Sequence, residues 1–383
     1  MAVKTRAAYG GGSMTERADG VWRLRVMTSR GQVERIFRGG QTAARRALNE
    51  LASEQPAPSG LTASGDMTEQ TFGQLLDKWT DHLEARGRAP KTLAENRREI
   101  ETRIRPRLGT IAVTELSAEH LDDAYSAWLK EGLSASSVHR HAAVISAALT
   151  QGVKWGWLDL NPAQRASAPA PTTTRKLVTP GPDQVVKLIH AAEESDPVMA
   201  TAIALAFITG GRRGELAALR WSDIDLDAGI VRIERSLTQI GTELSEKSTK
   251  TGRGRNVALD ERAVALLLRH RAWQLDLSRR AESPLVADPY VLSDNANGAR
   301  PIEPSKITDR FVSVRGKAHI RGVRFHDLRH AHVTQLLGAG VDATTVAARV
   351  GHASTRMTLD RYAHALPAGD VAAAAIIGAM LPA

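Results

Sequence analysis

Residues 209–216, Thr-Gly-Gly-Arg-Arg-Gly-Glu-Leu, are the most informative stretch of this 383-residue chain. They follow directly on its most apolar stretch, Val198 to Ile208, which is about half as long as a membrane span and which we expect to form a buried helix. Two glycines let the backbone turn where that helix ends. The turn brings the guanidinium of Arg212 to the edge of a hydrophobic core, with Glu215 as its natural partner.

Composition excludes several classes of protein. Hydrophobic residues make up 42% of the chain and charged residues 24%, so we expect most of it to fold. The absence of cysteine excludes a disulfide scaffold, a thiolate metal site and a cysteine nucleophile. A net charge of +9 favours a polyanionic partner, nucleic acid before a membrane. The first residues contain no apolar run of signal-peptide length, so we expect a cytoplasmic, nucleoid-associated protein with no membrane role.

Two stretches rich in Pro, Gly, Ser and Thr, residues 55–68 and 163–175, have the composition of exposed linkers. They predict three domains, which cover residues 1–54, 69–162 and 176–383. We expect a mainly α protein with small β elements. The first domain would be a small sheet packed on one helix, the second all-helical, and the third mixed but mostly helical.

Hydrophobic periodicity predicts the elements of each domain. Residues 21–37 alternate between apolar and basic positions about a turn at 29–31, which indicates a hairpin, and residues 42–53 have helical composition. Apolar residues in 69–160 recur at the spacing of four helices, with Ser117 and Ser134 at N-cap positions. In the third domain we expect a helix that begins at Thr179-Pro180 and a polar hairpin over residues 243–259. Further helices are predicted at about 260–281, 304–318, 326–338, 342–350 and 355–364.

Three further short stretches contain several Lys, Arg and His residues, and one of them is followed by a tyrosine. The chain has only four tyrosines. These stretches are Lys250-Thr-Gly-Arg-Gly-Arg255, His326-Asp-Leu-Arg-His330, and Gly351-His352 followed by Tyr362. Because His326 and Arg329 are three residues apart, they share one face of a helix. The separation of ten positions from His352 to Tyr362 allows a short helix to return the phenol to the same cleft.

This set of side chains suits a phosphodiester substrate. Guanidinium and imidazole donors stabilise the negative charge of a phosphoryl-transfer transition state. Nearby cations favour the phenolate of a tyrosine, which is then a better nucleophile. A lysine on a hairpin can give a proton to the leaving sugar oxygen.

In motif order, spacing and flanking residues, these strings resemble the tyrosine recombinases, the phage-type integrases. The family's T-G-x-R-x-[GS]-E-L box and the L-x-W-x-D-[IV]-D that follows are matched by residues 209–216 and 219–225. Its H-x-L-R-H, L-G-H and T-x-x-x-Y boxes are matched by residues 326–330, 350–352 and 358–362. The chain departs from the pattern at Gly211, where the family usually has a bulkier apolar residue, and at Val350, which replaces Leu. Neither departure removes a catalytic group.

The resemblance implies a site-specific DNA recombinase that integrates or excises a mobile element through a 3′-phosphotyrosyl intermediate, with no cofactor and no metal. It assigns Arg212, His326, Arg329 and His352 to the scissile phosphate, Tyr362 to the attack, and Lys250 to the general acid. Lys247 stays open as the alternative acid, because sequence does not determine the hairpin register. The resemblance also implies double-stranded DNA as the substrate, a homotetramer on that DNA, and an accessory DNA-bending or directionality protein as a candidate partner.

Basic residues outside these motifs are candidate DNA contacts. Residues 1–60 hold ten Lys and Arg against five Asp and Glu, and this domain resembles the arm-type-site binding domain of larger integrases. The helical second domain resembles the core-binding domain. The candidate DNA-binding residues are Arg23, Arg25, Arg35, Lys91, Arg97, His139, Arg140 and Arg253. For each of them, an ordinary solvated surface position is the competing interpretation.

Different functions remain open from the residues alone. The four-residue spacing of His326 and His330 is also found in zinc sites, but a zincin needs Glu directly after the first His, and Asp327 stands there. We expect His330 in the core or behind the site, and His332 at the surface. A DNA-binding regulator without cleavage and a type IB topoisomerase-like enzyme are two competing hypotheses. The six catalytic groups and the two linkers favour recombination over both.

Overall fold

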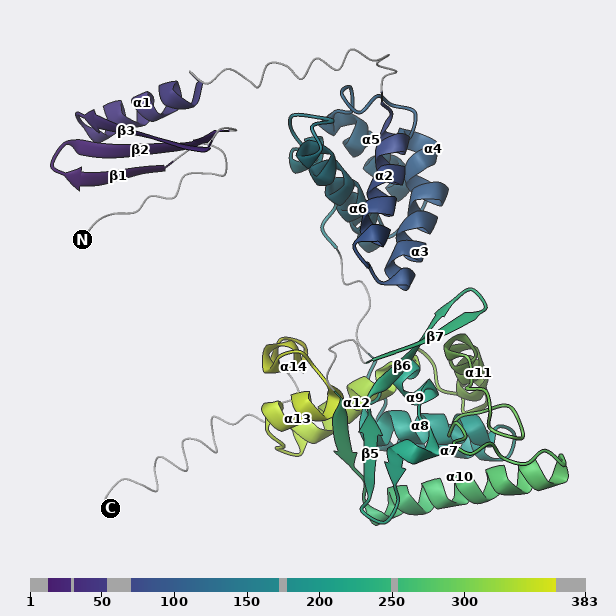
Figure 1. Ribbon diagram of the computed structural model, residues 1–383. Helices are drawn as coiled ribbons and strands as arrows, with labels where there is room; N and C mark the ends of the chain where they lie inside the picture. The colour runs from purple at the N-terminus through teal and green to yellow at the C-terminus, as the bar shows by residue number, and fades with distance from the viewer. Residues whose placement is uncertain (1–12, 29–30, 54–69, 172–177, 249–253, 363–383) are drawn as a thin grey trace, which may run out of the picture. The chain divides into compact units, whose positions relative to one another are not determined.

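The computed structural model describes residues 13–28, 31–53, 70–171, 178–248 and 254–362, and Figure 1 shows its helices and strands. The chain divides into two compact units, residues 1–68 and residues 69–383. Most of the described elements are helices, and the sheets are small. None of the described helices combines the length and the apolar character that crossing a bilayer requires.

The first unit is a three-stranded antiparallel sheet covered by one helix. Its elements are β1 (Ser13–Ala18), β2 (Val21–Thr28), β3 (Gly31–Arg38) and α1 (Gln41–Ser53), with strand order β1-β2-β3. Alternation along β2 puts Trp22 and Leu24 on the face that packs against Ala44 and Leu48 of the helix. The predicted hairpin and helix are confirmed, and β1 adds an edge strand that the periodicity did not reveal.

Residues 70–171 form an all-helical bundle with its own hydrophobic core. Its elements are α2 (Phe72–Ala85), α3 (Pro90–Glu99), a π-helical turn (Ile100–Ile104), α4 (Arg105–Leu108), α5 (Ala118–Lys130), α6 (Ala135–Lys154) and a 3-10 turn (Pro162–Gln164). The predicted N-caps are confirmed: the Ser117 hydroxyl accepts the backbone N–H of His120 at 3.3 Å, and that of Ser134 accepts the N–H of Ser137 at 3.1 Å.

Residues 163–171 belong structurally with these helices. Ala163 and Ala166 pack against the helical core. The Ser167 N–H donates to the Asp122 carboxylate at 2.6 Å, and the carbonyl of Pro169 lies 3.1 Å from Nδ1 of His139. Specific contacts therefore hold this stretch, although its composition is that of a linker.

Residues 178–362 contain a second helical core with two small sheets. The helices are α7 (Pro182–Glu193), α8 (Pro197–Thr209), α9 (Arg213–Ala217), α10 (Glu261–Arg280), α11 (Pro304–Lys317), α12 (Asp327–Gly338), α13 (Ala343–Val350) and α14 (Thr355–Tyr362). The helices predicted from periodicity in residues 260–364 are confirmed to within a few residues. The start predicted at Thr179-Pro180 was wrong, because Gly181 is the N-cap and Pro182 is the proline that occupies the first helical position.

The strand pairing differs from the prediction. The strands are β4 (Ile224–Asp225), β5 (Ile230–Ile233), β6 (Arg235–Ile240), β7 (Glu243–Ser248) and β8 (Arg255–Ala258), in the sheets β4-β5-β8 and β6-β7. Residues 243–259 do not fold back on themselves as a hairpin: β7 pairs with the preceding β6, and β8 pairs with β5, with Val257 opposite Val231. Alternation shows which face of a strand is buried, but it does not identify the neighbouring strand.

Helix α8 lies at the centre of this core. Its residues from Val198 to Ala206 are buried, as expected for a helix that is apolar on all sides. Helices α7, α9, α10, α11 and α12 all contact it (Figure 1). It ends at Thr209, where Gly210 adopts the left-handed conformation with φ +61° and closes the helix. The turn that follows α8 is thus attached to the most enclosed helix of the core.

Replacing Leu149 with Ala should strongly destabilise the helices of residues 70–171. Leu149 is fully buried on α6, so the substitution removes apolar contacts and leaves a cavity, at a cost of about 2–5 kcal/mol in the free energy of unfolding. Urea titration of the full-length protein, followed by tryptophan fluorescence, measures this loss in the free energy of unfolding. Leu160→Ala is the matched control, because Leu160 is 68% exposed and its loss should cost under about 0.5 kcal/mol. Equal effects of the two substitutions would contradict this packing of α6.

Candidate active site

The turn after α8 carries the first of the predicted site residues. A Cβ atom at Gly210 would lie 2.7 Å from Cγ1 of Val350 on α13 and 2.9 Å from Cδ2 of His332 on α12. Glycine is therefore required here for its backbone conformation and for the close approach of three helices. The Gly211 N–H donates to the Thr209 hydroxyl at 3.0 Å. This compact turn places Arg212 at the N-terminus of α9.

Arg212 is held from two sides. Its Nη1 donates to Oε1 of Glu215 at 2.7 Å, as the sequence predicted, and its backbone N–H donates to Oε2 of the same carboxylate at 2.9 Å. Its Nη2 donates to the carbonyl of Gly351 at 3.0 Å, directly after α13. The side chain is 30% exposed, so the guanidinium is positioned by protein contacts and still reaches the surface.

Glu215 binds a second arginine. Nη2 of Arg255 donates to Oε2 of Glu215 at 2.6 Å, and Nε of Arg255 donates to the carbonyl of Arg349 at 2.9 Å. The side chains of Glu215 and Arg255 are 1% and 8% exposed. Burial raises the pKa of Glu215, but the hydrogen bond and charge of Arg255, together with Arg212, outweigh burial and hold that pKa below its ordinary value. The ionised carboxylate therefore joins α9, β8 and the end of α13.

Arg329 is buried on the first turn of α12 and is 3% exposed. Its Nη1 donates to the carbonyl of Gly210 at 2.6 Å, whereas its Nη2 is buried and has no hydrogen-bond partner among the described residues. Burial, and then the charge of Arg212, lower the pKa of Arg329 to about 9, so the guanidinium stays protonated at neutral pH. A buried charged donor without an acceptor is costly, and a bound anion would remove that cost.

The two predicted histidines lie at the edges of this cluster. His326 is the N-terminal boundary residue of α12, and part of its ring is exposed. Burial of the rest, followed by the charge of Arg329, lowers the pKa of His326, so its ring is neutral at pH 7. His352 follows Gly351, which takes φ +69° at the end of α13. Nδ1 of His352 lies 2.7 Å from the hydroxyl of Thr358, which fixes the plane of its ring.

Tyr362 is the last described residue of α14 and is 1% exposed. It packs in a small apolar cluster with Val333 and Val346, and its hydroxyl is hydrogen-bonded to Nδ1 of His330. Helix α14 therefore returns the phenol to α12, where it is buried against His330. His330 is 3% exposed, which confirms that it lies in the core behind the site.

Lys250, the predicted general acid, lies outside the described residues, as does Arg253. Lys247 is half-buried in β7, opposite Ser236 of β6. The Ser236 hydroxyl would lie 2.8 Å from a Cβ atom at Gly214, so β6 passes directly over the first turn of α9. The hairpin that leads to Lys250 therefore passes close to Arg212. The choice between the two lysines stays a prediction.

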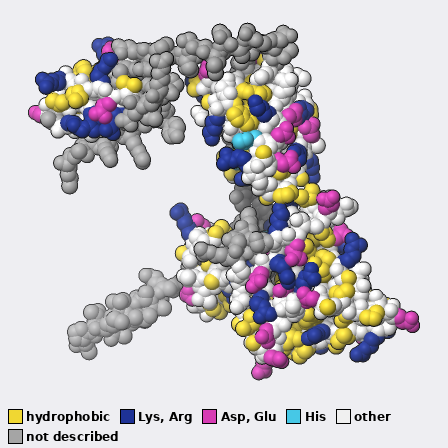
Figure 2. Space-filling view, in the orientation of Figure 1, with side chains coloured by type: hydrophobic (Ala, Val, Ile, Leu, Met, Phe, Trp, Pro, Cys, Tyr) yellow, Lys and Arg dark blue, Asp and Glu magenta, His cyan; other side chains and the backbone are white. Residues whose placement is uncertain are grey.

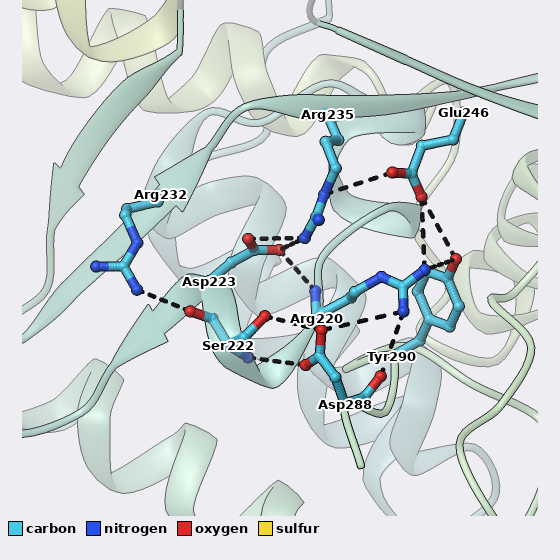
Figure 3. A network of polar contacts seen from close by, with 8 residues as sticks. All are labelled: Arg220, Ser222, Asp223, Arg232, Arg235, Glu246, Asp288 and Tyr290. Atoms are coloured by element: carbon cyan, nitrogen blue, oxygen red, sulfur yellow. Dashed lines mark hydrogen bonds and ion pairs between the residues drawn. The ribbon is translucent and has the colours of Figure 1, made fainter. Parts of the chain in front are cut away.

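A polar network anchors the hairpin that β6 and β7 form (Figure 3). The Tyr290 hydroxyl donates to Glu246 of β7 at 3.4 Å and accepts from Arg220 Nη2 at 2.6 Å, while the Arg220 guanidinium lies over the Tyr290 ring at 4.2 Å. Arg235 of β6 lies 3.6 Å from Glu246 and binds Asp223 at 2.6 Å. Both strands of the hairpin are thus tied to the 3-10 turn Trp221–Asp223, and Tyr290 serves as an anchor within this network.

Sequence reasoning missed Arg255 and misplaced His332. Arg255 ends the string Lys250 to Arg255, in which nothing distinguishes an arginine that points inward. His332 was expected at the surface, but it is 5% exposed, and its Nδ1 contacts the carbonyl of Phe207 at 2.7 Å. Burial lowers its pKa to about 4. The useful signal was the apolar character of α12 on several faces, since Leu328, Ala331 and Val333 are also buried.

The candidate DNA-binding residues of the first unit lie on both faces of its sheet. Arg23 and Arg25 lie on the open face, and each pairs with Glu34, at 2.9 and 3.0 Å. Arg35 stands opposite Leu24 and therefore belongs to the side that α1 covers. These three candidates thus do not share one face of the sheet.

The candidates in the helical bundle are mostly engaged with neighbouring groups. Arg97 binds Glu84 at 2.5 Å, Arg140 binds Glu99 at 2.6 Å, and His139 contacts the Pro169 carbonyl, while Lys91 is exposed. Figure 2 likewise shows Lys and Arg interspersed with Asp and Glu on the visible face. Exposed ion pairs are weak, so these arginines can exchange a carboxylate for a phosphate.

The histidine pair that raised the possibility of a zinc site meets edge to face. The ring centroids of His326 and His330 are 4.9 Å apart, and Nδ1 of His330 is engaged by the Tyr362 hydroxyl. Within the part of the chain that the structure describes, no group of three or more potential ligands is placed round a metal position. The geometry gives His330 a phenol as its partner.

Comparison with known proteins places most of the chain in one family. Residues 181–368 match the phage integrase family, and residues 71–129 match the phage integrase N-terminal SAM-like domain. A tyrosine recombinase XerC-like protein of Caldanaerobacter subterraneus is 24% identical over 334 residues, which cover 79% of this chain and 81% of that protein. The ICEBs1 integrase of Bacillus subtilis is 26% identical over 256 residues, 67% of this chain and 68% of that protein.

Solved structures share the fold. The Tn1549 transposon integrase in complex with transposon right end DNA has a TM-score of 0.66 at 20% identity, with 81% of this chain and 100% of that chain covered. A lambda integrase tetramer bound to a Holliday junction has a TM-score of 0.59 at 20% identity, with 91% and 97% covered. The helical bundle and the core around α8 therefore follow a known architecture.

Replacing Glu215 with Gln should lower the free energy of unfolding at neutral pH. It should also make that free energy fall less as the pH is lowered. Gln keeps the shape of the carboxylate but leaves Arg255 buried without a counter-ion, which costs about 3–5 kcal/mol in the free energy of unfolding. Because the folded pKa of Glu215 is depressed, its contribution is complete above the unfolded pKa of about 4.3 and is lost as pH falls through the folded value. Urea titrations at roughly pH 7, 5 and 3 measure both effects.

Glu115→Gln is the matched control for this measurement, because Glu115 is exposed. Its stability should follow wild type at every pH. A Glu215→Gln variant that loses as much stability on acidification as wild type would show that Glu215 is not the ionised partner of the two arginines.

Proposed function

Because this chain belongs to the phage integrase family of tyrosine recombinases, we propose that it breaks and rejoins DNA at specific sites, so that a mobile element is integrated or excised. The observation that carries the proposal is the Arg329 guanidinium, which is buried and protonated and whose Nη2 has no acceptor among the described residues. Arg212 and Tyr362 both lie near enough to influence the pKa of this guanidinium. An anion of the size of a phosphate would supply the missing acceptor.

The reaction is a phosphoryl transfer in two reversible steps. Oη of Tyr362 forms a bond to the scissile phosphorus, and the bond from phosphorus to the 5′ oxygen breaks. The DNA is then joined to the protein through its 3′ phosphate, and a lysine, Lys250 in our assignment, gives a proton to the 5′ oxygen. Since the energy of the phosphodiester is kept in the phosphotyrosyl bond, a 5′ hydroxyl of a partner strand reseals it without ATP.

Each cationic or imidazole group of the motifs has a physical task in this proposal. Arg212 and Arg329 place planar donors at the oxygens that gain charge in the transition state. His326 is neutral at pH 7 and supplies a hydrogen-bond donor without a further charge to desolvate. Gly351, whose carbonyl binds Arg212, places His352 next to that guanidinium.

We extend the proposal to the rest of the chain. Residues 69–162 would bind the core of each recombination site, with Lys91, Arg97, His139 and Arg140 on phosphates, and residues 1–54 would bind separate arm-type DNA through Arg23, Arg25 and Arg35. Residues 55–68 and 163–175 would join these domains to residues 176–383. Four protomers would act on two duplexes in the cytoplasm, where the nucleoid lies, with an accessory protein that bends DNA or sets direction.

Tyr362→Phe should abolish the covalent protein–DNA adduct and leave DNA binding unchanged, because it removes the attacking oxygen and nothing that contacts the phosphate. A nicked core-site duplex that traps the intermediate, separated by denaturing gel, measures the adduct. Tyr125→Phe removes the same atom from a tyrosine in the helical core, whose pKa burial raises to about 12, and it should form the adduct normally. An adduct that survives in Tyr362→Phe would assign the nucleophile elsewhere.

Arg329→Ala should slow single-turnover cleavage by about a hundredfold or more, the scale expected when one preorganised donor to a developing charge is lost. Arg232→Ala is the control, since Arg232 is exposed on β5 and donates to the Ser222 carbonyl at 2.7 Å, away from the arginine cluster. It should cleave at the wild-type rate. Equal rates for the two variants would place Arg329 outside the reaction.

Deletion of residues 1–62 should leave core-site cleavage intact but weaken assembly on DNA that carries arm-type sites, because tethered modules gain affinity from effective concentration. The removed residues carry an excess of positive charge, so the affinity of the full chain should fall more steeply with salt. Binding isotherms at several salt concentrations, on core duplexes with and without arm DNA, give both slopes. Equal slopes for the two proteins would mean that the first unit does not contact phosphates.

A further inference from the structure

His330 contacts the atom that performs the attack, yet neither step of the proposed phosphoryl transfer uses it. It lies on α12 directly after Arg329 and is 3% exposed. Its Nδ1 is hydrogen-bonded to Oη of Tyr362, and the two ring centroids are 5.6 Å apart. The partner phenol is itself 1% exposed. The contact is therefore sheltered from water on both sides.

We propose that His330 is the general base of the reaction: it takes the proton of the Tyr362 hydroxyl as Oη attacks phosphorus, and it returns that proton when the DNA strand is resealed. This inference rests on the proposed function, because it needs Tyr362 to be the nucleophile. It gives the nucleophile a proton acceptor, as the lysine gives the leaving group a proton donor.

The direction of the hydrogen bond supports this role. An ordinary phenol carries its own proton at neutral pH, so the Tyr362 hydroxyl can donate to Nδ1 of His330 in the tautomer that has its proton on Nε2. The His326 ring meets His330 edge to face, with centroids 4.9 Å apart, and burial holds the pKa of His326 below its ordinary value. A proton can therefore move onto His330 without a second charged imidazole beside it.

Carboxylates of the same region are engaged elsewhere. Glu215 accepts hydrogen bonds from Arg212 and Arg255. Asp327 is fully buried and accepts from the backbone and side chain of Arg324. A carboxylate held by guanidinium groups is a weak base, because its charged form is stabilised. Among these groups, the imidazole of His330 is the one in contact with the phenol.

The proton and electron balance is complete. The O–H bond of Tyr362 breaks and an N–H bond forms on His330, while the bond from Oη to phosphorus forms and the bond from phosphorus to the 5′ oxygen breaks. The proton that the 5′ oxygen gains comes from the lysine. The imidazolium forms near the positive Arg329, which opposes it, and the negative charge that develops on the phosphate oxygens favours both cations.

The test uses two substitutions in the full-length protein and single-turnover adduct formation on the nicked core-site duplex. His330→Asn keeps an acceptor oxygen close to the position of Nδ1 but cannot hold the proton, and His330→Ala removes the ring. Both should slow adduct formation by about a hundredfold or more, the usual contribution of a general base. Core-site affinity should stay within about threefold of wild type, since neither change touches the arginines.

Rescue separates proton transfer from packing. A tetrafluorinated tyrosine at position 362 has a much lower phenol pKa and ionises readily at neutral pH, so it should restore most of the rate in both variants. Added imidazole should also restore His330→Ala, by filling the space that the ring leaves. His332→Ala is the matched control, because His332 is buried on the same helix but contacts the carbonyl of Phe207. If this substitution slows adduct formation, neither the fluorinated tyrosine nor imidazole should restore the rate.

Three outcomes would overturn the inference: a wild-type rate in His330→Asn, a wild-type rate in His330→Ala, or a slow rate that neither fluorotyrosine nor imidazole improves. The first would reduce His330 to a positioning residue, and the last would make it part of the packing alone. Failure of the proposed function looks different, because wild type would then form no adduct, or the adduct would persist in Tyr362→Phe.

Discussion

The geometry of the proposed active site depends on one buried carboxylate, Glu215. It accepts hydrogen bonds from Arg212 and from Arg255, and Arg255 also reaches the carbonyl of Arg349. Through these contacts the start of α9, the start of β8 and the end of α13 are fixed to one another. A neutral residue at this position would leave two guanidinium groups without a counter-charge, and the free energy cost of a buried unpaired cation is large.

One carboxylate does not balance the cations around it. Arg329 is buried with a pKa of about 9, and its Nη2 finds no acceptor in the part of the chain that the structure describes. Arg349 is half-buried and has carbonyl partners from Ile208 and Ala258. This excess of positive charge destabilises the protein by itself and becomes favourable when a phosphate enters. A site of this kind has its donors in place before the substrate arrives, so little reorganisation remains for the transition state.

The surrounding core keeps these charges in position. Helix α8 is apolar on all sides and ends in the glycine turn that carries Arg212, while α12 is buried around the segment that carries Arg329 and His330. The polar network under β7 adds a second constraint, since Glu246, Tyr290 and Arg220 hold the hairpin from which Lys250 follows (Figure 3). Rigid apolar elements thus carry the polar groups, and short-range contacts orient them.

The sequence by itself determined the helices, their caps at Ser117 and Ser134, and the order of the motifs that carry Arg212, Arg329 and Tyr362. These features depend on local chemistry and on residue spacing along one chain segment, which a single sequence contains. Only the tertiary structure decided that β7 pairs with β6, that His332 is buried, that Arg255 shares Glu215, and that His330 is the partner of the Tyr362 hydroxyl. Each of these depends on which distant segments pack together, and hydrophobic periodicity reports that a face is buried without specifying what covers it.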